Sequence, residues 1–99
     1  MPLHLLRYQS TAQLSLTDKD LQALLTKARA FNKLNQISGM LLYRAGQFVQ
    51  VLEGEEDVLR SLYNKIACDP RHTNVLKLAD EPLHQRGFAG WSMAYRQDA

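Results

Sequence analysis

The chain has 99 residues, a net charge of +2 and a single cysteine, which is the length of one domain, here residues 1–99. Hydrophobic residues make up 45% and charged residues 22% of the chain, values that exclude disordered, collagen-like and low-complexity sequence. Because Cys68 stands alone, an internal disulfide and a zinc site with several cysteines are excluded. With no secretory leader and no apolar run of membrane length in view, we expect a cytoplasmic protein without membrane contact.

The first half of the chain predicts a strand, a helix and a hairpin. Residues 3–8 are apolar and partly alternating, as in a short strand. Thr17 is a suitable N-cap for the helix that follows, because acids at positions 18 and 20 lie in its first turn, where the positive helix end favours them. Residues 37–43 and 47–53 are two strands joined by a tight turn. The apolar stripe of the helix repeats with the helical period and contains Leu21, Leu24, Leu25, Ala28, Phe31 and Asn32.

The second half predicts another helix and two more strands. We expect Gly54 to end the hairpin and the three acids after it to begin the helix. An Asp-Pro pair at 69–70 ends this helix, and residues 75–78 form a fourth strand. Residues 88–95 form the last strand, after a loop that contains Pro82. The inward side chains of the second helix are Val58, Leu59, Leu62 and Ile66.

The resulting order of elements is β-α-β-β-α-β-β. Two helices separated by hairpins and strands pack on one face of a mixed sheet, so we expect a ferredoxin-like α+β sandwich with five strands. This fold hosts many unrelated functions, and the function must therefore be argued from particular side chains.

Two amides lie where the apolar pattern requires a buried side chain. Asn32 continues the stripe of the first helix near its end, and Gln50 lies between Phe48 and Leu52 on one face of a strand. A buried amide needs partners for its donors and its acceptor oxygen. Asn32 either caps the helix or bonds a loop backbone, or it binds the polar edge of a ligand between the helices. Gln50 is either satisfied by neighbouring backbone or exchanges donor and acceptor by rotating its amide.

The remaining polar and aromatic residues carry no functional message on their own. Tyr8 ends the first strand, and Trp91 and Met93 lie two apart on the last strand, where we expect them to share a face and fill the core. The sequence has no phosphate-binding glycine loop, no HExxH motif, no serine elbow and no carboxylate pair placed for acid–base work, so we expect neither an enzyme nor a metal site. Charge compensation and a turn explain the cluster at the end of the second helix, Lys65, Asp69, Arg71 and His72.

The hairpin sequence ISGMLLYRAGQFVQVLEG, from Ile37 to Gly54, closely resembles the characteristic hairpin of BLUF domains, the flavin-binding blue-light sensors. The resemblance covers about residues 3–96, with Ser38 in place of the more usual threonine and Phe31 where relatives often carry a polar residue. Outside the hairpin it rests on Tyr8, Ser10, Ala28, Arg29, Asn32, Asp69, Pro70, Arg71, His72, Arg86, Phe88, Trp91, Ser92 and Met93.

The resemblance implies a light-driven switch around a flavin held between the two helices, normally FAD and often FMN. In the family's pattern Tyr8 gives an electron and a proton to the excited flavin. Gln50, between Tyr8 and the flavin, then rearranges its amide, which shifts the flavin absorption to the red. Trp91 and Met93 on the last strand relay the change, and which of them points inward varies within the family.

A flavin is an apolar plate with one polar edge, so its pocket needs apolar walls and a few amides. The resemblance places Asn32 at the pyrimidine edge, and Lys65 or Asp69 can meet the second ring carbonyl. Arg71 and Lys33 are candidates for the phosphates. The full set of cofactor residues that we expect is Leu24, Leu25, Ala28, Asn32, Phe48, Gln50, Lys65, Ile66, Asp69, Arg71 and His72.

The predicted outer face of the sheet is apolar as well, with Leu3, Leu5, Val49 and Val51. Two helices cannot cover both faces, so we expect a homo-oligomer or a separate signalling protein across the outer face of this short form without an output domain.

Two alternatives to a photoreceptor stay open. An RNA-binding module of the RRM type shares the order of elements, but it needs several exposed aromatics where this chain has Phe48, and a charge of +2 attracts phosphate weakly, so we expect no nucleic acid partner. A flavin-free interaction domain of the same fold is the other alternative, against which the retained Tyr8, Asn32 and Gln50 argue.

Overall fold

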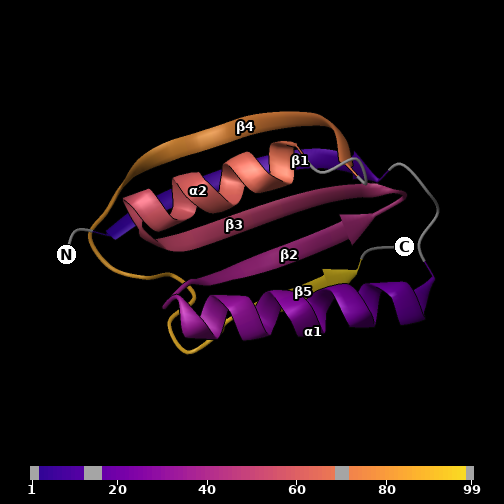
Figure 1. Cartoon of the computed structure of the whole chain (residues 1–99), viewed down its shortest axis with the longest axis horizontal. Helices are drawn as coiled ribbons and strands as arrows, with labels where there is room; N and C mark the ends of the chain where they lie inside the picture. Colours follow the sequence, from indigo (N-terminus) through magenta and orange to yellow (C-terminus); the bar gives the residue numbers. More distant parts are fainter. Residues whose placement is uncertain (1–2, 13–16, 69–71, 98–99) are drawn as a thin grey trace.

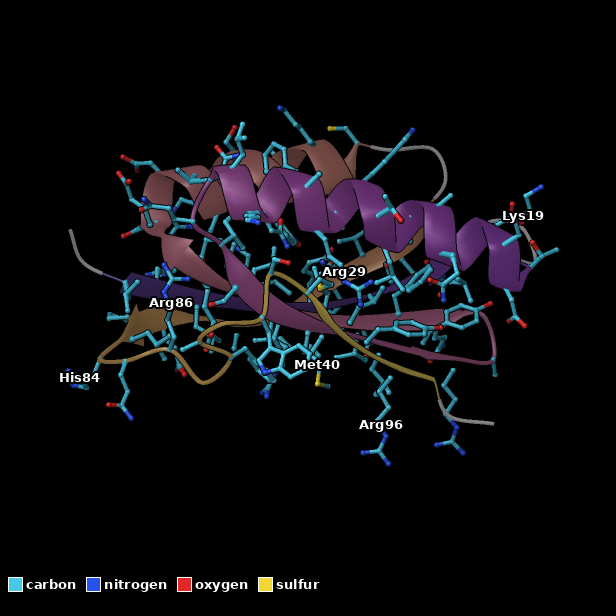
Figure 2. The ribbon with its side chains drawn as sticks, turned by 90° about the horizontal axis from the view of Figure 1, so that it is seen from below. Lys19, Arg29, Met40, His84, Arg86 and Arg96 are labelled. Carbon is cyan, nitrogen blue, oxygen red and sulfur yellow. The ribbon has the colours of Figure 1, made fainter. Side chains whose placement is uncertain are left out.

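A computed structural model describes residues 3–12, 17–68 and 72–97 as one sheet with two helices on one of its faces (Figures 1 and 2). Within these residues the sheet has five strands in the order β4-β1-β3-β2-β5, with β2 and β5 parallel and the other neighbours antiparallel. The predicted ferredoxin-like α+β fold is thereby confirmed. The elements are β1 (Leu3–Ala12), α1 (Asp18–Leu34), β2 (Ser38–Arg44), β3 (Gln47–Glu55), α2 (Glu56–Ala67), β4 (His72–Leu83) and β5 (Ala94–Gln97).

Helix α1 begins as the sequence predicts. Thr17 is its N-cap and forms a capping box, in which the backbone N–H of Asp20 donates to Thr17 Oγ1 at 3.1 Å and the backbone N–H of Thr17 donates to Asp20 Oδ2 at 3.0 Å. Of the expected stripe, Leu21, Leu25 and Asn32 are buried. This face therefore holds the helix over the sheet, on the side of β2 and β5 (Figure 1).

The hairpin of β2 and β3 depends on two glycines. Ala45 (φ +49°) and Gly46 (φ +81°) form the predicted turn with two left-handed residues, the geometry that matches the twist of a hairpin. A Cβ atom on Gly39 would lie 2.0 Å from the backbone oxygen of Val51, so only glycine allows the two strands to approach this closely.

Three strands are longer than the sequence predicts. Strand β1 continues to Ala12, and β3 runs through Gly54, which pairs with His4 and so does not end the strand. Strand β4 covers 72–83 and includes Pro82, which we had expected in a loop. Proline fits here because β4 is an edge strand, where its missing N–H removes no ladder bond on the outer side.

The last strand is shorter and later than the predicted 88–95. It covers Ala94–Gln97, while residues 84–93 form an irregular loop that turns at Gly90 (φ +85°). The prediction that Trp91 and Met93 share a strand face is therefore wrong, because the extended geometry with its alternation of side chains begins only after Met93.

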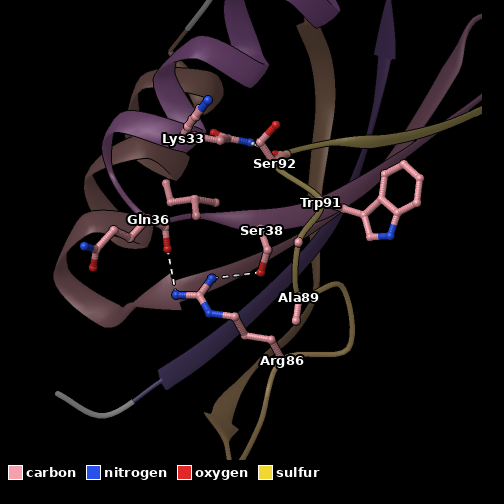
Figure 3. Close-up of a pocket in the computed structure, with 10 residues that line it drawn as sticks. Lys33, Gln36, Ser38, Arg86, Ala89, Trp91 and Ser92 are labelled. Atoms are coloured by element: carbon pink, nitrogen blue, oxygen red, sulfur yellow. Dashed lines mark hydrogen bonds between the residues drawn. The ribbon is translucent and has the colours of Figure 1, made fainter.

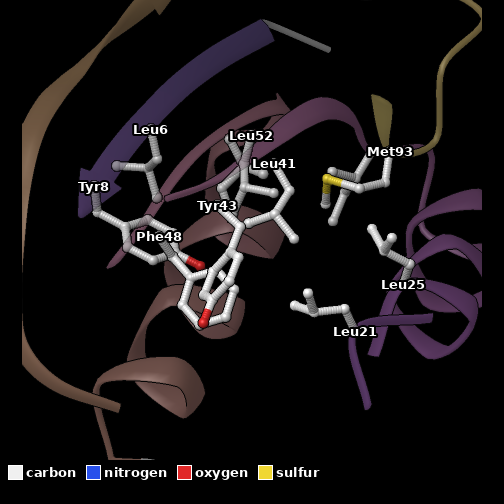
Figure 4. Close-up of a cluster of buried hydrophobic side chains, with 11 residues drawn as sticks. Leu6, Tyr8, Leu21, Leu25, Leu41, Tyr43, Phe48, Leu52 and Met93 are labelled. Carbon is white, nitrogen blue, oxygen red and sulfur yellow. The ribbon is translucent and has the colours of Figure 1, made fainter. Parts of the chain in front are cut away.

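The core lies between the inner face of the sheet and the helices (Figure 4). Its members are Leu6, Tyr8, Leu21, Leu25, Ile37, Leu41, Tyr43, Phe48, Leu52, Leu59 and Met93. Of the inward residues predicted on α2, Leu59 is fully buried and Val58, Leu62 and Ile66 are half-buried against this cluster. The face opposite the helices carries half-buried apolar side chains, namely Leu3, Leu5, Met40, Leu42, Val49 and Val51. No helix within the described residues is long and apolar enough to span a membrane.

Candidate functional site

A chain of three hydrogen-bonding side chains crosses the inner face of the sheet. Tyr8 on β1 lies directly opposite Gln50 on β3, so their side chains share one face. The Tyr8 hydroxyl donates to Gln50 Oε1, and Gln50 Nε2 lies 3.8 Å from the sulfur of Met93. The geometry thus connects the phenol, through one amide, to the segment that leads into β5.

Tyr8 is held in its neutral form. Its side chain is 2% exposed, and the ring of Tyr63 on α2 meets it edge-on, with 5.5 Å between centroids and 72° between planes. Burial raises the pKa of the Tyr8 phenol well above its usual value, and the neighbouring Tyr63 raises it further. The phenol therefore keeps its proton at neutral pH and is available as a hydrogen-bond donor to the amide.

Asn32 joins α1 to the same segment. It is 2% exposed, and its Nδ2 donates to the backbone oxygen of Ser92 at 2.7 Å. The helix is capped instead by Asn35, so the capping alternative for Asn32 is wrong. The amide nitrogen of Asn32 instead bonds loop backbone, which was the other alternative.

Met93 and Trp91 take opposite positions. Met93 is 1% exposed and its backbone oxygen accepts from Arg29 Nε at 3.0 Å, whereas Trp91 is 61% exposed. Met93 is thus the inward residue that contacts Gln50, and Trp91 points away from α1 (Figure 3). The sequence left this choice open, since both side chains are apolar.

The sides of α1 and α2 that pack toward the core are apolar. On α1, Leu25 is fully buried while Leu24 and Ala28 are half-buried, and Ile66 is half-buried on α2; all four pack in or against the core. Lys65 on α2 lies 5.9 Å from the ring centroid of Phe31 on α1, a cation–π contact from one helix to the other.

The other predicted cofactor residues lie in three different settings. Phe48 is 2% exposed and packs on Tyr43 with 4.9 Å between ring centroids, so it belongs to the core. Asp69 and Arg71 lie outside the described residues, as does the side chain of His72, the first residue of β4. Lys33 borders an open hollow of about 540 Å³ at the end of α1, across from Arg86 (Figure 3).

Sequence reasoning assigned no role to several residues that position this site. Arg29 and Ser92 entered only as parts of the resemblance, yet they bond to Met93 and Asn32. Tyr63 was not singled out because its position on the inward side of a helix is an ordinary place for an aromatic core residue.

The donors and walls of the site fit a flavin. Gln50 Nε2 donates to a thioether sulfur, which is a weak acceptor. A carbonyl oxygen in its place would form a stronger hydrogen bond. A plate between the helices would cover the half-buried Leu24, Ala28 and Ile66, and the Lys65 ammonium on α2 lies near the ring of Phe31 on α1. Apolar walls with a few amide groups at one end are what an isoalloxazine ring requires.

Comparisons with known proteins agree on one family. The BLUF model, described as sensors of blue light using FAD, matches residues 3–94. The photoactivated adenylate cyclase subunit beta of Euglena longa is 40% identical over 89 residues, which are 89% of this chain and 10% of that protein. The blue light- and temperature-regulated antirepressor BluF of Escherichia coli K12 is 31% identical over 77 residues, which are 76% of this chain and 19% of that protein. The chain thus spans a tenth to a fifth of these curated relatives.

Solved structures of this family superpose on nearly the whole chain. The dark-state structure of the BLUF protein BlrB has a TM-score of 0.91 and 33% identity, and covers 97% of this chain and 73% of that chain. The ground state of BlsA has a TM-score of 0.90 and 39% identity, and covers 98% of this chain and 66% of that chain. The chain therefore belongs to the BLUF family and is a flavin-binding blue-light receptor domain.

Proposed function

We propose that Tyr8 and Gln50 form the light-driven switch of this domain and that Met93 carries its signal toward the outer face of the sheet. The observation that supports this most directly is the continuous contact from the Tyr8 hydroxyl through the Gln50 amide to the Met93 sulfur. Gln50 contacts two side chains that are far apart in the sequence, one on β1 and one in the loop before β5.

Bound flavin supplies the absorption of blue light and an electron acceptor. Tyr8 would give one electron and its hydroxyl proton to this acceptor, and loss of the proton would remove the hydrogen bond that orients Gln50. The Gln50 amide then rotates, so that its Oε1 and Nε2 exchange places. After rotation its Nε2 no longer faces the Met93 sulfur, and the segment that begins β5 loses this contact.

The cofactor is proposed to be FAD, with FMN as an alternative, since FMN is bound in one solved relative, BlrP1 of Klebsiella pneumoniae. Its ring would be held by Asn32, Gln50 and the walls from Leu24 to Ala28 and at Ile66. Lys65 would face a ring carbonyl, and Lys33 and Arg71 are the candidates for phosphate contacts. The domain itself would be a sensor that turns over no substrate, while relatives such as the cyclases carry further sequence.

Substitutions of the two switch residues test this function. Tyr8→Phe removes the hydroxyl and Gln50→Leu removes the amide, so both variants should bind flavin but lose the reversible red shift under blue light. Tyr43→Phe is the matched control, because Tyr43 is another buried tyrosine and its ring packs on Phe48. A normal red shift in Tyr8→Phe would refute the role of Tyr8, and loss of the shift in the control would show that the assay reports general damage.

The proposed output surface is the outer face of the sheet, occupied by a second copy of the chain or by a separate signalling protein. Half-buried apolar side chains line this face, and exposed Leu76 (52%) and Trp91 (61%) extend the apolar surface of the molecule. An apolar patch of this kind marks an interaction site. A flavin-free interaction domain would use the same surface, so a test of flavin binding distinguishes it from the photoreceptor.

A further inference from the structure

A buried carboxylate on the outer side of β3 fixes the start of the loop that carries Trp91. Glu53 pairs with Leu5 and Ser38 and so belongs to the outer face, yet it is 1% exposed. Burial of a charge is costly unless hydrogen bonds compensate it. Glu53 accepts from Ser38 Oγ at 2.9 Å, from the Gly87 N–H at 2.7 Å and from the Phe88 N–H at 2.9 Å.

Arg86 completes this arrangement. Its Nη1 donates to Ser38 Oγ at 2.8 Å and to the Glu53 backbone oxygen at 3.0 Å, and its Nη2 donates to the Gln36 backbone oxygen at 2.7 Å (Figure 3). The Ser38 hydroxyl therefore accepts from a guanidinium and donates to a carboxylate, which leaves it one orientation. Ser38, Glu53 and Arg86 together are named the loop anchor below.

The end of the same loop is held by a different set of groups. The Gly39 N–H donates to the Trp91 oxygen at 3.1 Å, and Asn32 and Arg29 bond to the oxygens of Ser92 and Met93. Between the two ends lies Gly90, whose left-handed backbone turns the chain. One end of the loop thus depends on the Gln50 site through Met93, and the other end does not.

We infer that the loop anchor is the fixed point against which the Gln50 switch moves Trp91. Because residues 86–88 are tied to β2 and β3, a change at Met93 that passes back along the loop acts on the short segment 89–92, which bears the exposed Trp91 and is held by Gly39 and Asn32. Without the anchor the whole loop would adjust, and the change would not be directed to Trp91. Glu53 and Arg86 are therefore positioning residues for signal output, an inference that rests on the proposed switch.

Glu53→Gln tests the anchor with little change in shape. It replaces one acceptor oxygen with an NH₂ group, so at least one of the three donors around Glu53 loses its partner. Trp91 is the single tryptophan of the sequence, so tryptophan emission comes from the loop, and comparing variants with equal red shifts accounts for energy transfer to the flavin. In flavin-loaded protein we expect the red shift of Glu53→Gln to equal that of the unchanged chain, and the light-induced change in Trp91 emission to be at least halved. The exposed Glu81→Gln on β4 is the matched control and should leave both signals unchanged.

The outcomes separate the anchor from the switch. If the unchanged chain shows no red shift, the proposed switch fails and the anchor fails with it. If the unchanged chain shows a red shift without an emission change, or if Glu53→Gln shows both signals in full, the anchor alone is refuted. Arg86→Lys, which cannot reach the same three acceptors, is the second variant and should behave as Glu53→Gln does. Failure of both variants to fold would also overturn the inference, because the anchor would then serve the fold and not the output.

Discussion

At the scale of single residues, the proposed switch requires a phenol that holds its proton. Tyr8 is buried beside Tyr63, and both burial and this neighbour raise its pKa. The folded chain therefore binds the Tyr8 proton at pH values where the unfolded chain, with a phenol pKa of about 10, releases it. The stabilisation from the neutral phenol is complete below about pH 10 and is lost as the pH rises above it.

The raised pKa of Tyr8 gives a prediction for unfolding at alkaline pH. Between about pH 10 and pH 11 the free energy of unfolding should fall more steeply in the unchanged chain than in Tyr8→Phe, by up to about 1.4 kcal/mol per pH unit. Urea titrations of both proteins at several pH values measure the two slopes. Equal slopes would contradict the raised pKa of Tyr8. In the same account the red shift should not depend on pH between about 6 and 9.

The opposite exposures of Met93 and Trp91 give a second prediction. Met93→Ala opens a cavity in the core and should lower the free energy of unfolding by about 2–5 kcal/mol, whereas Trp91→Ala, at an exposed position, should change it by less than about 1 kcal/mol. Chemical denaturation of the two variants measures both. A larger loss for Trp91→Ala would show that the tryptophan is the inward residue.

At the scale of elements, the close approach of β2 to β3 depends on Gly39. Gly39→Ala places a Cβ atom against the Val51 backbone oxygen, and the strands must separate. We expect it to cost more than about 4 kcal/mol or to prevent folding. Gly46→Ala at the turn should cost about 1–2 kcal/mol, because it meets no neighbouring atom but must adopt a left-handed backbone. Thermal melts compare the stability of the two variants. A smaller loss of stability for Gly39→Ala than for Gly46→Ala would contradict the close approach of the two strands.

Elements with strong local signals were predictable from the sequence, and those set by pairing were not. The Thr17 cap and the Ala45–Gly46 turn follow from residues adjacent in the chain. The length of β4 does not, because its pairing with β1 extends over Pro82, which locally indicates a loop. The late start of β5 also has no local signal, since its partner β2 and the bonds from α1 decide where the strand begins.

At the scale of the whole molecule, two helices on one face leave the other face of the sheet available for a partner. We expect association to depend on the middle of this face, where Val51 lies between Arg7 on β1 and Met40 on β2. Val51→Lys should lower the apparent mass in analytical ultracentrifugation or abolish capture by the signalling partner, with the red shift unchanged. A flavin-loaded chain that is monomeric at tens of micromolar would count against the homo-oligomer.

The candidate site was predictable as far as single side chains with unusual polarity reveal it. Asn32 and Gln50 stand out because amides interrupt apolar patterns, and the resemblance adds Tyr8. The choice between Met93 and Trp91 and the contacts of Glu53 and Arg86 depend on how an irregular loop folds over the sheet. No periodicity of the sequence encodes such a loop.

The most direct measurement is the visible absorption spectrum of the flavin-loaded chain before and after blue illumination. We predict a bound-flavin spectrum that shifts to the red under light and returns in darkness. A chain that stays colourless after addition of FAD and FMN would contradict flavin binding by this domain. A bound flavin without a shift would contradict the switch of Tyr8 and Gln50.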